Sequence, residues 1–150
     1  MTETLDAHAS IRIAAGPERV WRALVDPDQV REYMFGAEVR SDWREGSPIT
    51  WSGEWKGKQF EDKGEILEVA PARRLRYTHY SPLTGEPDVP SSYHTVTIEL
   101  APAGESTDVE LDQSGNADAK SREHSEQNWS QMLEGLKRVV ERGDGERAPD

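Results

Sequence analysis

Alternating apolar and polar positions mark a series of short strands along most of the chain. In residues 7–14, Ala7, Ala9, Ile11 and Ile13 share one face, and polar side chains occupy the other. A period of two is typical of a strand with one buried face. The same pattern predicts further strands at residues 37–43, 48–55, 59–69, 73–80, 92–100 and 107–113.

Helical spacing replaces this pattern in two regions. A Gly-Pro pair at 16–17 stops the first strand, and the residues after it predict a helix that ends before Asp26. Asp26 can cap a second short helix at about residues 27–34. Near the end of the chain, apolar residues at i, i+3, i+4 and i+7 predict a long helix from about residue 118 or 121 to about 142. The polar residues 143–150 are expected to be disordered.

This order of elements indicates an α+β fold. Consecutive strands with short turns pair in an antiparallel way, so we expect one antiparallel sheet of about six to seven strands. One face of this sheet suits water and the other needs a cover. The long terminal helix is the only predicted element that can supply the cover.

The register of two neighbouring strands, 73–80 and 92–100, decides which side chains meet on the covered face. Antiparallel pairing about the centre of their connecting loop puts the apolar residues of both strands on the same face. A slip of one residue would bring Tyr80 and Tyr93 to that face instead. The predicted partners are His79 with His94 and Tyr77 with Val96.

The strand at 59–69 has no single parity. Gly64 and Ile66 alternate on one face, whereas Leu67 and Val69 alternate on the other. A β-bulge near Gly64 would reconcile the two sets.

Composition narrows the functional classes. Lys and Arg number 18 against 29 Asp and Glu, which gives a formal charge of −11 over 150 residues. This balance argues against nucleic-acid binding, which relies on clustered basic residues. No apolar run is long enough to cross a membrane, and no secretory signal is recognisable, so we expect a cytoplasmic protein. The length suits a single domain over residues 1–150 with an ordered core at about 7–142.

Three segments together resemble a known family: PERVWRALVDPDQVREYM, GEILEVAPARRLRYTHY and NWSQMLEGLKRVVE. Over about residues 8–141 the chain is similar to the START-like (SRPBCC) superfamily, and within it to the family named for the activator of Hsp90 ATPase. The resemblance implies the helix-grip (START/Bet v 1-like) fold, in which a curved sheet wraps around the C-terminal helix, two short helices follow strand 1, and a cavity remains between sheet and helix. Many relatives bind an apolar ligand there, some in the wider superfamily are cyclases or hydratases, and the namesake stimulates a chaperone ATPase. The chain departs from the family at Tyr33-Met34, where tryptophan is common, and at Asn128, where glycine is usual.

The histidine pair His79 and His94 is the most specific chemical feature. Buried histidines need partners, so the pair could hydrogen-bond the polar end of a ligand or act as general acid and base. Water could equally satisfy two half-exposed rings at the end of the sheet. A metal site is not expected, because local spacing shows no third ligand.

The leading hypothesis is a cofactor-free protein that binds a small hydrophobic molecule between sheet and helix, with Tyr77 as a further polar anchor. One alternative is a cyclase, dehydratase or hydrolase that uses His79 and His94, and another is a chaperone-associated module. No nucleic-acid or membrane partner is expected, and the chain could be a monomer or a dimer. The candidate ligand-binding residues are Trp21, Phe35, Trp43, Trp51, Tyr77, His79, His94, Val96, Trp129 and Leu133.

Overall fold

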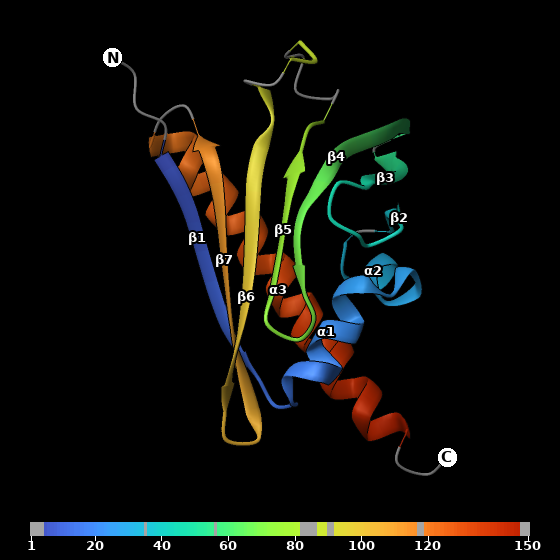
Figure 1. The fold of residues 1–150 in the computed structure, drawn as a ribbon, viewed down its shortest axis with the longest axis vertical. Coiled ribbons are helices and arrows are strands. Elements are labelled where there is room, and N and C mark those ends of the chain that lie inside the picture. The colour runs from blue at the N-terminus through green and yellow to red at the C-terminus, as the bar shows by residue number, and fades with distance from the viewer. Residues whose placement is uncertain are drawn as a thin grey trace.

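The computed structural model describes residues 5–34, 36–55, 57–81, 87–89, 92–116 and 119–147 (Figure 1). The predicted order of strands and helices is confirmed. In chain order the elements are β1 (Leu5–Ile13), α1 (Pro17–Val25), α2 (Pro27–Tyr33), β2 (Glu38–Ser41), β3 (Pro48–Trp55), β4 (Lys58–Ala70), β5 (Arg74–His79), β6 (His94–Ala103), β7 (Ser106–Asn116) and α3 (Ala119–Arg147).

The strands form one curved antiparallel sheet with the order β1-β7-β6-β5-β4-β3-β2. Helix α3 runs obliquely across one face of this sheet (Figure 1). Helices α1 and α2 lie near the C-terminal half of α3. The two short helices meet at Asp26, whose side chain accepts a hydrogen bond from the Asp28 backbone N–H at 3.0 Å. The fold is therefore the expected α+β helix-grip arrangement. Among the described residues, no helix is both long enough and apolar enough to span a membrane.

The predicted register of β5 and β6 is confirmed. His79 pairs with His94 and Tyr77 pairs with Val96. Both members of the second pair are buried, so this face of the sheet belongs to the core. A slipped register is thereby excluded, and the partners that it would have used, Tyr80 and Tyr93, stack on each other with ring centres 5.2 Å apart.

The predicted bulge in β4 is present, but it lies at Leu67 rather than beside Gly64. Ile66 pairs with Tyr77, and Glu68 pairs with Arg76. Leu67 has no partner in the ladder and is the extra residue. The bulge turns Leu67 outward and leaves it 39% exposed. Gly64 has a different role, because a Cβ atom there would lie 1.7 Å from the backbone oxygen of Thr78. Only glycine allows the two strands to approach so closely.

Helix α3 continues to Arg147, beyond the predicted end near residue 142. The glycines at 143 and 145 suggested an earlier stop. Glycine lowers helix propensity by about 1 kcal/mol but keeps its backbone N–H and C=O, so a helix can pass through it. Residues 143–147 therefore belong to the helix, and residues 148–150 lie outside the described residues.

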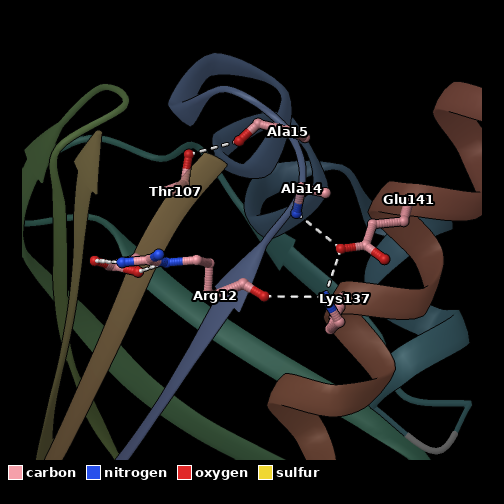
Figure 2. Close-up of polar contacts among 7 residues, drawn as sticks. Arg12, Ala14, Ala15, Thr107, Lys137 and Glu141 are labelled. Carbon is pink, nitrogen blue, oxygen red and sulfur yellow. Dashed lines mark hydrogen bonds and ion pairs between the residues drawn. The ribbon is translucent and has the colours of Figure 1, made fainter. Parts of the chain in front are cut away.

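A group of polar contacts fastens α3 to the end of β1 (Figure 2). Glu141 Oε2 accepts hydrogen bonds from the Ala14 backbone N–H at 2.7 Å and from Lys137 Nζ at 2.6 Å. Lys137 Nζ also donates to the Arg12 backbone oxygen at 3.0 Å. Two backbone groups at the point where the first strand ends are therefore satisfied by one ion pair on the helix.

Gly64→Ala is expected to disrupt the β4–β5 pairing, because the added methyl group would collide with backbone that cannot rotate away. We expect a loss of about 3 kcal/mol in the free energy of unfolding, the upper end for overpacking, measured by urea denaturation. Gly53→Ala is the matched control on β3, since its Cβ would meet the flexible Phe60 ring at 3.1 Å. Equal losses in the two variants would contradict this account of Gly64.

Glu141→Gln is expected to lower the free energy of unfolding by about 1 kcal/mol at neutral pH. The hydrogen bonds from Lys137 and from the Ala14 N–H lower the pKa of Glu141 in the folded protein. Its contribution is therefore present above the unfolded-state pKa and is lost as pH falls through the folded-state pKa. The difference between wild type and variant, measured by denaturation between pH 7 and pH 3, should shrink as the pH falls. Glu134→Gln, at an exposed position of the same helix, should show no such trend.

Candidate functional site

A small cavity lies where the three helices meet the concave side of the sheet. Its volume is about 20 Å³. One water molecule needs about 10–15 Å³ on this measure, whereas small-molecule sites usually span about 300–1,000 Å³. The cavity implied by the family resemblance is therefore present but holds little more than a water. Its lining residues are Leu24, Val30, Tyr33, Met34, Val39, Trp43, Ile49, Trp51, Leu75, Tyr77, Ile98 and Met132.

Three of the predicted ligand-binding residues, Trp43, Trp51 and Tyr77, line this cavity. Trp43 has a φ of 56°, in the left-handed region that bulky side chains rarely adopt. Its backbone N–H donates to Ser41 Oγ at 3.0 Å, which helps to hold this conformation. The wall of the cavity therefore contains a residue whose backbone is strained by about 1–2 kcal/mol.

The other predicted apolar contacts do not line the cavity. Val96 and Leu133 are buried in the core, and Trp21 is partly buried against it. Trp129 is also partly buried, and its indole N–H donates to Gln113 Oε1 at 2.6 Å. These four residues stabilise the packing of helices on the sheet. Phe35, the remaining aromatic candidate, lies outside the described residues.

Two tyrosine hydroxyls belong to side chains that line the cavity. Tyr33 donates its hydroxyl proton to the Ala23 backbone oxygen at 2.8 Å, which ties α2 to α1. Burial raises the pKa of Tyr77, so its hydroxyl stays protonated at neutral pH. Since no hydrogen bond to the Tyr77 hydroxyl is found among the described residues, this hydroxyl is the group best suited to bind a polar atom inside the cavity.

His79 and His94 are register partners, but their hydrogen bonds lead to different strands. His79 Nε2 lies 2.9 Å from Asp62 Oδ2 on β4. His94 Nδ1 lies 2.7 Å from the backbone oxygen of Ser114 on β7. A carboxylate and a carbonyl both accept, so Nε2 of His79 and Nδ1 of His94 each carry a proton. Each ring is thus held by its own neighbour rather than by the other histidine.

Asp62 is the polar residue of this region that the sequence did not reveal. It lies opposite Trp51 in the β3–β4 ladder, and its side chain is 16% exposed. Its Oδ1 atom is buried and has no hydrogen-bond partner among the described residues. Fixing the bulge at Leu67 would have shown that Asp62 and Ile66 share one face of β4. Within the described residues, no group of three acidic, histidine or cysteine side chains could hold a metal ion.

Trp129→Phe should leave the buried Gln113 oxygen without a donor and cost about 1–3 kcal/mol. Gln113→Leu should likewise strand the indole N–H, whereas the double variant removes both partners together. A double-mutant cycle by chemical denaturation is therefore expected to show a coupling of at least about 1 kcal/mol. Losses that simply add would mean that the 2.6 Å contact does not stabilise the protein.

The chain is similar to a known protein family and to several solved structures. The family model described as "Activator of Hsp90 ATPase homolog 1-like protein" matches residues 14–141. The solution structure of a protein from Cytophaga hutchinsonii is 50% identical, with 97% of this chain and 99% of that chain covered and a TM-score of 0.83. No curated protein matches the sequence.

Two more distant structures show the fold alone. The solution structure of the Aha1 dimer from Colwellia psychrerythraea is 18% identical, with 91% of this chain and 97% of that chain covered and a TM-score of 0.71. The crystal structure of Ara h 8.0201 is 11% identical, with 91% and 97% covered and a TM-score of 0.73. The helix-grip architecture is therefore shared across sequences that have little else in common.

Proposed function

The chain belongs to the activator of Hsp90 ATPase homolog 1-like family, and from that premise we propose that it binds a small hydrophobic molecule between the sheet and α3. The observation that carries the proposal is the composition of the cavity wall. Apolar and aromatic side chains from α1, α2, α3 and four strands converge on one point of the core. Such a wall offers an apolar ligand burial worth about 25 cal/mol per Å² of its surface.

Ligand entry requires the cavity to widen, because its present volume is about 20 Å³. The residues best suited to move are Met34 and Met132, whose unbranched side chains adopt many rotamers. Helix α2 lies close against α3 because residue 135 is glycine, since a Cβ atom there would lie 3.0 Å from Tyr33 Cβ. Movement of α2 outward, away from α3, would widen the cavity. The ligand's apolar burial has to offset the cost of this rearrangement.

The two alternative functions stay predictions. General acid–base catalysis by His79 and His94 would need both rings to face one substrate, and their hydrogen bonds lead to opposite neighbours. A chaperone-associated role would use a surface rather than the cavity. Among the described residues, the large apolar side chains that are exposed are Leu67 and Val89. Neither alternative has a specific contact that favours it over ligand binding.

The proposal is tested by thermal unfolding with a panel of fatty acids, sterols and aromatic polyketides. At a free concentration of one hundred times Kd, a true ligand should add about 2.7 kcal/mol and raise Tm by roughly 5–10 °C. Met132→Ala, which changes the cavity wall, should alter the shift, and Leu136→Ala, buried on the same helix outside the lining, should not. A panel without any stabilising compound, or equal shifts in both variants, would contradict the proposal.

A further inference from the structure

We propose that Asp62 and His79 form a recognition site for the polar end of the bound molecule, and that this end is a hydrogen-bond donor, either a hydroxyl or an ammonium group. The inference rests on the proposed function and specifies its ligand. It assigns a role to a carboxylate that packing of the core does not explain. It also separates His79 from His94, which face the same side of the sheet but have different partners.

The pair is mostly withdrawn from water. The side chains of His79 and Asp62 are 25% and 16% exposed, and their closest polar atoms are 2.9 Å apart. The indole ring of Trp51 meets the His79 ring edge to face, with ring centres 5.0 Å apart. Trp51 is also the register partner of Asp62. The tryptophan therefore fixes the imidazole while the carboxylate orients it.

With the His79 ring neutral, the two side chains present acceptors and no free donor. The Nε2–H of His79 donates to Asp62 Oδ2, so the other ring nitrogen, Nδ1, has a lone pair in the neutral ring. Asp62 Oδ1 is buried and unpartnered among the described residues. A buried carboxylate oxygen without a donor costs free energy, and a ligand that brings a donor recovers it. The site thus selects hydroxyl or ammonium groups.

Neither Asp62 nor His79 lines the cavity, but both adjoin Trp51 of the cavity wall. Trp51 lines the cavity and touches both His79 and the cavity-lining Tyr77, whose ring centre is 5.2 Å from that of Trp51. Tyr77 and His79 are on the same face of β5 and two residues apart, which corresponds to about 6.6 Å along a strand. A molecule with its apolar body in the cavity can therefore place a polar end against Asp62 and His79.

Charge narrows the class of ligand further. The carboxylate of Asp62 repels an anionic end, and the chain as a whole has a formal charge of −11. Fatty acids and other carboxylates are therefore disfavoured. Phenols, sterol alcohols and apolar amines keep both the hydrogen bond and the electrostatic match.

The experiment compares four naphthalene probes by isothermal titration calorimetry with the full chain: 2-naphthol, its methyl ether, 2-naphthylmethylamine and 2-naphthoate. The ether keeps the apolar body but has no donor. We expect naphthol or the amine to bind at least about tenfold more tightly than the ether, the factor that one charge-assisted hydrogen bond supplies, and naphthoate to bind most weakly. Comparison of naphthol with the amine identifies which donor the site prefers.

Two variants assign the preference to Asp62. Asp62→Asn removes the charge at nearly constant shape and should bring naphthol and ether within about twofold of each other. Glu61→Gln removes the same charge one residue away, at an exposed position, and should keep the preference. In ¹⁵N NMR spectra, naphthol should shift the ring nitrogens of His79 in the wild-type protein, a readout that does not depend on the folding of any variant.

The possible failures are distinguishable. If neither naphthol nor the amine binds more tightly than the ether, if naphthoate binds tightly, if the preference is unchanged in Asp62→Asn, or if neither donor probe shifts the His79 nitrogens, the recognition site is overturned and the proposed function stands. Absence of binding by the whole naphthalene series would count against both. A tenfold preference that disappears only in Asp62→Asn supports the site.

Discussion

The structure depends on removing the concave face of one antiparallel sheet from water, and α3 does most of this. Leu133, Leu136 and Val140 of this helix are buried against the strands. The polar contacts to β1 then fix where the helix lies, because Glu141 and Lys137 satisfy backbone groups that would otherwise face water at the end of that strand. Sheet and helix are consequently stable only together, since neither can bury its apolar surface alone.

The position of α3 also explains where the cavity is. The helix packs mainly against β1, β7, α1 and α2, whereas the cavity beside β3 is bordered also by the two short helices. Short helices cover a curved surface less completely than a long one, and the gap that remains is lined by aromatic rings and methionines. At the other side, Thr107 donates to the Ala15 backbone oxygen at 2.7 Å and closes the corner between β1 and α1 (Figure 2). One half of the protein is therefore firmly fastened, while the other contains space and adaptable side chains.

Most of the fold could be predicted because it depends on local patterns. The period of two, the capping residue Asp26 and the pairing of His79 with His94 all follow from spacing along the chain. The bulge at Leu67 could not be placed, because Ile66, Leu67 and Val69 are all apolar and hydrophobicity alone does not say which of them turns outward. The inward position of Asp62 could not be predicted for the same reason. When the inward face of a strand is not known, a carboxylate on it is expected to face water.

The volume of the cavity lies beyond sequence reasoning for a different reason. The cavity volume is the small difference between the large volume enclosed by the backbone and the volume of the side chains that fill it. One side chain in another rotamer can therefore decide whether a cavity remains. The sequence identified Trp43, Trp51 and Tyr77 correctly as facing inward. It also assigned Trp129 to ligand contact, whereas the indole N–H is used by Gln113 to hold the helix on the sheet. Residue type could not distinguish lining the cavity from holding the helix on the sheet, because an inward-facing tryptophan can do either.

Two costs to stability are concentrated in this region, and neither is required by the architecture. Trp43 adopts a φ of 56° at the cavity wall, and the buried Oδ1 atom of Asp62 has no hydrogen-bond partner in the part of the chain that the structure describes. A glycine at position 43 or an apolar residue at position 62 would relieve each cost while the sheet and α3 stayed in place. Local rules are usually broken where a site needs a specific geometry, and the rest of the fold then supplies the stability that the site forgoes. Strain at Trp43 and the buried Asp62 oxygen that has no partner among the described residues therefore support the proposal that this half of the protein binds a ligand.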